Sequence, residues 1–355
     1  MTQSLFRGDR VLVVGGAGFV GSNLVRRLLA EQAREVVVVD NLLSAERENI
    51  PTDSRVKFVE GSIADAKVLE AVSDDFDYMW HLATYHGNQS SIANPLEDHE
   101  NNLITTLRLL ERVREFKRMK KLVYAASGCV LAPHTFDDAT PVEEDGDAPF
   151  DLDSPYQISK IVGEFYCVYY HKQHSVPTVR ARFQNVYGPG EILGAGQWRG
   201  TPATVWRNVV PTFVYRALHG MPLELDNGGL ASRDFIFVDD IVEGLVRCAL
   251  RGEPGDVYNL ASGQETTIAV LAAQINELAG GNSTITTTPP RPWDRAGRRV
   301  GSTRKSKEAL GFEARTDVAD GLHRTIDWTK ANGELIDRAI AKHANRMKIA
   351  TPSKR

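Results

Sequence analysis

The sequence predicts an α/β protein built on a doubly wound parallel sheet. Three observations carry this prediction. Continuous apolar runs, VLVV at residues 11–14 and VVVV at residues 36–39, are typical of strands covered on both faces. Segments with the helical spacing of apolar residues alternate with such strands. A glycine-rich turn joins the first strand to the first helix.

The composition is that of an ordinary globular protein, and the charge argues against some classes of binding partner. It has 355 residues, of which 42% are apolar and 25% charged. The net charge of -4 gives no whole-molecule attraction to nucleic acid or anionic membranes. The three cysteines have neither disulfide nor metal-ligand spacing, so no metal site is expected. With no apolar run near the ~18 residues of a membrane helix and no cleavable leader pattern, we expect a cytoplasmic protein.

The first βαβ unit contains a dinucleotide-binding pattern. Gly15, Gly16, Gly18 and Gly21 satisfy both GxxGxxG and GxGxxG between a buried strand and a helix. Glycines there let the backbone turn sharply and approach a pyrophosphate, which then binds free N–H groups at the helix start. Asp40 follows the second strand, 19 residues after Gly21, where a carboxylate accepts hydrogen bonds from ribose hydroxyls and repels a 2′-phosphate. The pattern predicts NAD as the cofactor.

Further strands are predicted at residues 56–63, 76–84 and 121–127. Because parallel sheets bind ligands beyond the carboxyl ends of their strands, Ser62, Thr84 and Ser127 should lie on one rim. His81 has no evident catalytic partner in the sequence, and we interpret it as a structural hydrogen-bonding residue.

A tyrosine and a lysine indicate the chemistry of the site. The segment SPYQISK opens with a helix-start signal, and Tyr156 and Lys160 fall one turn apart on one helix face. An ammonium beside a phenol stabilises the phenolate and lowers its pKa from the usual ~10. Such a phenolate can take the proton of a substrate hydroxyl while the hydride on the same carbon leaves for a nicotinamide.

Together, the glycine turn, Asp40, Ser127 and the Tyr156–Lys160 pair resemble the extended short-chain dehydrogenase/reductase family, specifically its nucleotide-sugar epimerases and dehydratases. The resemblance runs from Arg10 to about residue 330. It implies a Rossmann-type NAD-binding domain and a smaller α/β substrate domain. The expected division is residues 1–185 with 231–262 for NAD, 186–230 and 263–335 for substrate, and 336–355 as a basic C-terminal tail. From Lys342 on, this tail is expected to be solvated.

The resemblance also implies roles for single residues. In that family the residue matching Ser127 hydrogen-bonds the oxygen that becomes a ketone, Tyr156 is the acid/base and Lys160 tunes it. Expected cofactor contacts are Gly15, Gly18, Phe19, Val20, Asp40, Asn41, Ser62, Ile63, Leu82, Ala83, Thr84 and Asn102, with Tyr156 and Lys160. Expected substrate contacts are Gln89, Ser90, Ser127, Asn185, Asn208 and Arg233, with Arg298 and Arg299 both candidates for the diphosphate.

The residues after Ser127 bear on the reaction. Dehydratases of the family carry Asp-Glu there, whereas this chain has Gly128 and Cys129. Simple 4-epimerases need neither acid, but GDP-mannose 3,5-epimerases resemble this chain in carrying Ser-x-Cys. Cys129 is therefore either a small buried filler or a proton-transfer group. The segment 190–207 is long for the family, and we expect it to border the substrate with Trp198 and Trp206 either stacking on it or packing the loop.

The sequence therefore predicts an NAD-dependent epimerase that acts on a nucleotide-diphosphate hexose or uronate through transient oxidation at C4. One alternative is a C5 or C3 epimerase or a dehydratase that uses the same oxidation with Cys129 as acid/base. Another is a non-catalytic dinucleotide-binding scaffold, against which the retained Ser127, Tyr156 and Lys160 argue. Helices expected at residues 97–118 and 155–174 match a four-helix dimer interface of the family, which implies a homodimer.

Overall fold

The computed structural model describes residues 4–131, 135–137, 139–291 and 297–350. The largest sheet among these residues has seven parallel strands. Its strand order is β10-β6-β5-β4-β1-β2-β3. The strands are β1 (Arg10–Val14), β2 (Glu35–Asp40), β3 (Val56–Glu60), β4 (Tyr78–His81), β5 (Lys121–Ser127), β6 (Thr178–Phe183) and β10 (Val257–Leu260). This sheet confirms the predicted Rossmann-type fold.

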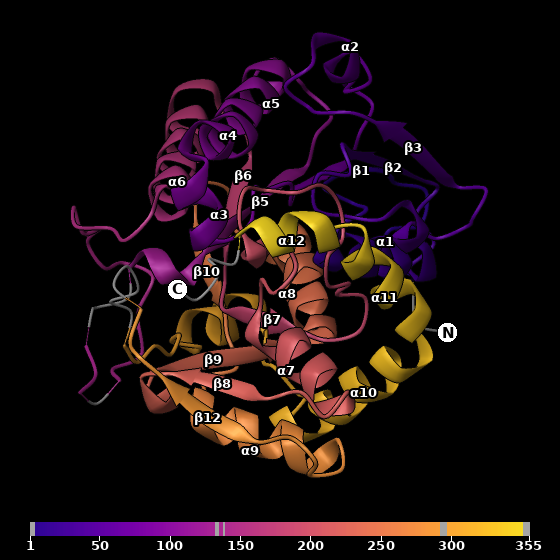
Figure 1. The fold of residues 1–355 in the computed structure, drawn as a ribbon. Helices are drawn as coiled ribbons and strands as arrows, with labels where there is room; N and C mark the ends of the chain where they lie inside the picture. Colours follow the sequence, from indigo (N-terminus) through magenta and orange to yellow (C-terminus); the bar gives the residue numbers. More distant parts are fainter. Residues whose placement is uncertain (1–3, 132–134, 138, 292–296, 351–355) are drawn as a thin grey trace.

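Helices cover both faces of the sheet (Figure 1). They are α1 (Phe19–Ala30) and α8 (Val238–Arg251) on one face, and α5 (Thr105–Val113) and α6 (Pro155–His174) on the other. Successive residues of a strand point to opposite faces, so β1 must be apolar throughout. Val11 and Val13 pack in the core with α1 and α8, whereas Leu12 and Val14 pack in the core with α5 and α6.

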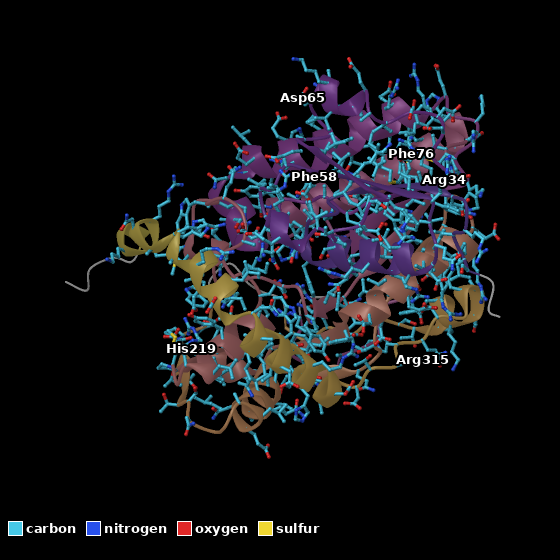
Figure 2. All side chains as sticks on the ribbon, turned by 90° about the vertical axis from the view of Figure 1, so that its right-hand side faces the viewer. Arg34, Phe58, Asp65, Phe76, His219 and Arg315 are labelled. Atoms are coloured by element: carbon cyan, nitrogen blue, oxygen red, sulfur yellow. The ribbon has the colours of Figure 1, made fainter. Side chains whose placement is uncertain are left out.

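Two smaller sheets lie beyond the large one. β9 (Ser232–Phe237) pairs with β7 (Asn185–Tyr187) and β11 (Glu265–Thr267), and β8 (Leu223–Asp226) pairs with β12 (Ile285–Thr288). The helices α7 (Val209–Leu218), α9 (Ile268–Leu278) and α10 (Val318–Ala331) supply the core here. Figure 2 shows Phe58 and Phe76 in the upper, amino-terminal part and His219 and Arg315 in the lower part.

Residues 231–262, which the sequence assigned to the NAD-binding domain, divide between the two parts. β9 belongs to the smaller three-stranded sheet, while α8 packs on β5 and β6 and β10 joins the edge of the large sheet. The shorter elements are α2 (Ala66–Leu69), α3 (Asn88–Ala93), α4 (Pro95–Asp98), the 3-10 turns η1 (Arg47–Asn49), η3 (Gly128–Val130), η4 (Pro202–Thr204) and η5 (Asn227–Gly229), and the π-helical turns η2 (His99–Ile104) and η6 (Ser306–Leu310). The single helix expected at residues 97–118 is thus α4, η2 and α5 in succession, ending at Val113.

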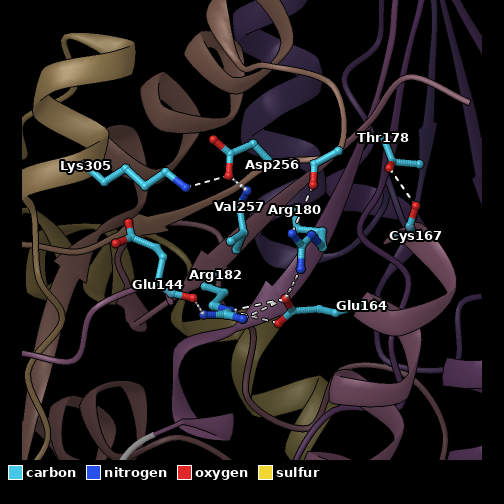
Figure 3. A network of polar contacts seen from close by, with 10 residues as sticks. Glu144, Glu164, Cys167, Thr178, Arg180, Arg182, Asp256, Val257 and Lys305 are labelled. Atoms are coloured by element: carbon cyan, nitrogen blue, oxygen red, sulfur yellow. Dashed lines mark hydrogen bonds and ion pairs between the residues drawn. The ribbon is translucent and has the colours of Figure 1, made fainter. Parts of the chain in front are cut away.

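A buried ion-pair network anchors α6 to β6 (Figure 3). Glu164 is fully buried and accepts from Arg182 Nε at 2.9 Å and from Arg180 Nη1 at 3.2 Å. Arg182 also donates from Nη1 to the backbone carbonyl of Glu144. Because Glu164 lies one helical turn after Lys160, this network fixes the part of α6 that faces the ligand end of the sheet.

The segment 336–350 is helical and not frayed, and most of its described side chains from Lys342 on are exposed. It forms the end of α11 (Gly333–Ala341) and α12 (Ala344–Ala350), which cross the molecule in yellow in Figure 1. Ile336 and Ala339 are buried against Ile192 and Leu193. Composition could not reveal this apolar partner, which lies far away in the chain. Among the described residues, no helix has the length and apolar character needed to cross a membrane.

Candidate active site

A cavity of about 760 Å³ lies at the carboxyl ends of the large sheet's strands and brings together most of the predicted site residues. The predicted residues that line it are Gly15, Gly18, Phe19, Val20, Asp40, Asn41, Ser62, Ile63, Leu82, Ala83, Thr84, Gln89, Ser90, Ser127, Tyr156, Lys160, Asn185, Asn208, Arg233 and Arg299. Asn102 and Arg298 are not among the lining residues. Cys129 has its backbone in η3, but its side chain lies outside those that the structure describes.

The glycine turn has the close backbone approach that a dinucleotide needs. Gly15 has a φ of +85°, and a Cβ there would lie 2.5 Å from the backbone nitrogen of Ala83. A Cβ on Gly21 would collide with the Gly15 carbonyl. α1 starts directly after Gly18, and its first residues line the cavity without a side-chain cap on their N–H groups. These residues fit the pyrophosphate of NAD.

Asp40 ends β2 and lines the same cavity. Its side chain accepts hydrogen bonds from the backbone nitrogens of Ala17 at 3.0 Å and Leu42 at 2.9 Å. Burial raises the pKa of the Asp40 carboxyl, and the backbone hydrogen bonds act in the opposite direction. A carboxylate at this strand end fits the ribose of NAD, so the residues present suit the cofactor that the sequence predicts.

Three of the four predicted catalytic residues, Ser127, Tyr156 and Lys160, converge from β5 and α6. Ser127 is the last residue of β5 and is 9% exposed. Lys160 is buried, and its Nζ donates to the carbonyl of Ala125 at 3.0 Å and lies 5.9 Å from the centre of the Tyr156 ring. The backbone N–H of Tyr156 donates to Ser91 Oγ at 3.1 Å, which ties the start of α6 to α3.

Asn102 lies behind the cavity instead of lining it. Its Oδ1 accepts from Thr84 Oγ1 at 2.9 Å and from the backbone N–H of Tyr85 at 2.6 Å. Its Nδ2 donates to Asp98 Oδ2 at 2.8 Å and to Ser159 Oγ at 3.1 Å. Asn102 therefore connects the loop after β4 to α6 and holds Thr84 in place.

The two neighbouring arginines that the sequence could not separate have different surroundings. Arg298 forms a two-point ion pair with Glu265, with Nε–Oε1 and Nη2–Oε2 distances of 2.6 Å and 2.7 Å. Arg299 lines the cavity at 8% exposure, and its Nε and Nη2 have no hydrogen-bond partner among the described residues. Arg233 lines the cavity too, with Nη1 donating to two backbone carbonyls. Arg299 therefore brings a buried positive charge to the cavity wall, whereas Arg298 is paired with Glu265, and such a charge is suited to an anionic ligand group.

Sequence reasoning expected the polar loop 85–91 to touch the sugar but did not single out His86 in it, and it did not identify Glu191. Both residues line the cavity on either side of Asn208. His86 Nε2 lies 3.1 Å from Asn208 Oδ1, and Asn208 Nδ2 donates to Glu191 Oε1. Burial lowers the pKa of His86 to about 4 and raises the pKa of Glu191 to about 7. Asn208 follows His86 by 122 residues, so no local pattern could have paired them.

The long segment between β7 and α7 borders the cavity through several of its residues. Arg199 Nη1 donates to Ser44 Oγ at 2.7 Å, which places the segment against the loop after β2 as well. Trp206 lines the cavity and its ring centre lies 5.8 Å from that of Tyr215. Trp198 packs on the ring of His343, so the two tryptophans have different environments.

A glycine cradle, an acidic residue after β2 and a tyrosine–lysine pair in one cavity define a dinucleotide-dependent enzyme with a Rossmann-type fold. The chain belongs to the NAD dependent epimerase/dehydratase family, whose model matches residues 11–261. It is an NAD-dependent epimerase, an isomerase, which confirms the predicted cofactor and enzyme class.

Three proteins with similar sequences or structures are two sugar-nucleotide enzymes and one protein solved with NAD+ and UDP. WbmF of Bordetella bronchiseptica, solved with NADH and with NAD+ and UDP, is 57% identical with a TM-score of 0.89, over 98% of this chain and 99% of that one. The UDP-glucose 4-epimerase of Mycolicibacterium smegmatis is 31% identical over 90% of this chain and 98% of its own. The dTDP-glucose 4,6-dehydratase of Streptomyces antibioticus is 29% identical over 91% of this chain and 92% of its own.

Proposed function

We propose that this NAD-dependent epimerase inverts C4 of a UDP-linked hexose or uronate through a transient C4 ketone. The observation that carries the proposal is that Ser127, Tyr156 and Lys160 line the same cavity as the glycine cradle and Asp40. The UDP in the WbmF structure and the similarity to the UDP-glucose 4-epimerase of Mycolicibacterium support a uridine nucleotide.

NAD, when bound, supplies the hydride acceptor and later returns the hydride. Tyr156 accepts the proton of the C4 hydroxyl as the ketone forms and gives it back after the sugar has turned in the cavity. Ser127 hydrogen-bonds the C4 oxygen and keeps it beside the tyrosine. The buried ammonium of Lys160, 5.9 Å from the tyrosine ring centre, favours the phenolate electrostatically. Asp40 and the N–H groups at the start of α1 hold the cofactor.

Two arginines would hold the substrate diphosphate. Arg233 and Arg299 line the cavity, whereas Arg298 does not line it and is ion-paired with Glu265. A guanidinium can bind phosphate oxygens with two hydrogen bonds, which fixes orientation as well as supplying affinity. We therefore assign Arg299, and not Arg298, to the diphosphate.

The experiment that tests this proposal is turnover of a panel of UDP-, GDP-, CDP- and dTDP-sugars in D2O, followed by NMR and mass spectrometry. C4 inversion of a UDP-sugar with no deuterium on the sugar carbons is expected. Deuterium at C5 or C3, or loss of water, would overturn C4 epimerisation in favour of the alternatives that use the same oxidation. Tyr156→Phe is the matched control, because it removes the proton-transferring hydroxyl and keeps the ring.

We also propose a homodimer formed through α6. Ile158, Phe165 and Tyr169 are 50%, 56% and 51% exposed and recur at spacings of seven and four residues, which puts them on one side of the helix. An exposed apolar row of this kind is typical of a protein–protein contact. The cytoplasmic location stays a prediction.

A further inference from the structure

The cavity holds a polar chain that the proposed C4 chemistry does not use. His86 comes from the loop after β4, Asn208 is the residue before α7, and Glu191 belongs to the segment between β7 and α7. His86 Nε2 is 3.1 Å from Asn208 Oδ1, and Asn208 Nδ2 donates to Glu191 Oε1. All three residues line the cavity.

The direction of these hydrogen bonds fixes the tautomer of His86. Asn208 directs its N–H group at Glu191, since an ionised carboxylate only accepts hydrogen bonds. Asn208 must then present its carbonyl oxygen to His86, so the Nε2 of His86 carries the hydrogen and donates. In a neutral imidazole of this tautomer, the lone pair lies on Nδ1. A proton on Glu191 would leave this order intact, because Oε1 can accept while Oε2 carries the hydrogen.

The surroundings of His86 keep the ring neutral. Burial is the largest cause that lowers its pKa to about 4, and the positive charges of Arg207, Arg199 and Lys160 act in the same direction. The hydrogen bond with Asn208 acts in the opposite direction and does not restore the usual value. A neutral imidazole with a free lone pair is a hydrogen-bond acceptor and a weak base.

His86 lies beside the tyrosine to which the proposal gives the C4 hydroxyl. The ring centres of His86 and Tyr156 are 6.0 Å apart and their planes meet at 75°, an edge-to-face contact. Both rings line the cavity, so a sugar that places its C4 hydroxyl at Tyr156 brings its neighbouring substituents to His86.

We propose that His86 determines the sugar specificity of the enzyme, with Nδ1 accepting a hydrogen bond from a hydroxyl or N–H group carried next to C4. Asn208 and Glu191 act through His86 as positioning residues, since they hold the tautomer that leaves Nδ1 unprotonated. This inference rests on the proposed C4 epimerisation. A sugar without the donor would leave Nδ1 unpaired inside the cavity, which should lower kcat/KM about 10- to 100-fold.

The test compares two variants of His86 in the holoenzyme. His86→Phe keeps an aromatic ring against Tyr156 and removes the acceptor, whereas His86→Asn keeps an acceptor oxygen near the Nδ1 position. The substrates are the UDP-sugar that is turned over and its 3-deoxy and 6-deoxy analogues. The wild type should discriminate against one analogue about 10- to 100-fold, His86→Phe should lose that discrimination, and His86→Asn should recover part of it. Unchanged discrimination in His86→Phe overturns the proposal.

Two further readouts separate this proposal from the proposed function. The ¹⁵N NMR shifts of His86 in the holoenzyme should show a protonated Nε2 and an unprotonated Nδ1 at neutral pH, and the opposite tautomer overturns the proposal. If no sugar is turned over, the proposed function fails, and the same discrimination is then measured on the dissociation constants of the UDP-sugars. Solvent deuterium that enters C3 or C5 in the wild type and not in His86→Phe would make His86 a proton-transfer group and overturn the recognition role.

Discussion

Replacing Glu191 with glutamine should change how the stability of the protein depends on pH. Burial raises the pKa of Glu191 from 4.5 to about 7, and this difference corresponds to about 3 kcal/mol of folding free energy. Between these two values the unfolded chain has lost the proton while the folded protein keeps it. The free energy of unfolding therefore falls as the pH rises through this window, and the glutamate's contribution is lost above pH 7.

Glutamine preserves the local contact and removes the titration. Its Oε1 can still accept from Asn208 Nδ2, but it has no proton to lose near neutral pH. The stability of Glu191→Gln relative to the wild type should increase by about 3 kcal/mol between pH 4.5 and pH 8. Urea unfolding at a fixed NAD concentration, followed by the fluorescence of the five tryptophans, measures this difference. A difference that stays constant with pH would refute the reasoning.

A variant comparison is needed because His86 titrates in the opposite sense. Its pKa is lowered from 6.5 to about 4, so the unfolded chain binds the proton first as the pH falls and stability is lost in that direction. Between pH 4.5 and 6.5, His86 and Glu191 therefore change the free energy of unfolding in opposite directions, and the two changes partly cancel in the wild type. Glu334→Gln, the same substitution at an exposed position of α11, is the matched control.

Three further predictions concern the ligand, the core and the assembly. Arg299→Ala should weaken UDP binding about 10- to 100-fold in calorimetry and Arg298→Ala much less, whereas the reverse order would contradict the assignment of the diphosphate site. Glu164→Gln should destabilise the protein by about 3–5 kcal/mol in urea unfolding, because Arg182 stays buried with its charge uncompensated; a loss under about 1 kcal/mol would show that the network adds little. Phe165→Asp should convert the dimer to a monomer in light scattering, and a wild-type monomer, or a variant dimer, would rule out the α6 interface.

The large sheet and its cofactor cradle were predictable because the evidence for them is local. Buried parallel strands are continuous apolar runs, and the constraints on Gly15 and Gly21 arise within one βα turn. Tyr156 and Lys160 are likewise one helical turn apart. In each case the residues that define the feature lie within about a dozen positions of one another, so a local sequence pattern is enough to predict the feature.

The features that the sequence did not reveal depend on contacts between distant segments. β9 pairs with β7 and β11, not with the large sheet, because its register partners come from elsewhere in the chain. Arg298 and Arg299 differ through Glu265, which accepts from Arg298 and leaves Arg299 to the cavity. Ile336 is buried in a cluster with Ile192 and Leu193, which come from the distant segment between β7 and α7.

The central claim is that Tyr156 works on the C4 hydroxyl while the C4 hydrogen leaves and returns within one active site. Turnover of a UDP-sugar deuterated at C4 tests it most directly. The account predicts that the epimeric product keeps the deuterium at C4 in the wild type and that Tyr156→Phe loses at least about 100-fold in kcat. Exchange of the C4 deuterium with solvent, or full activity of Tyr156→Phe, would contradict it.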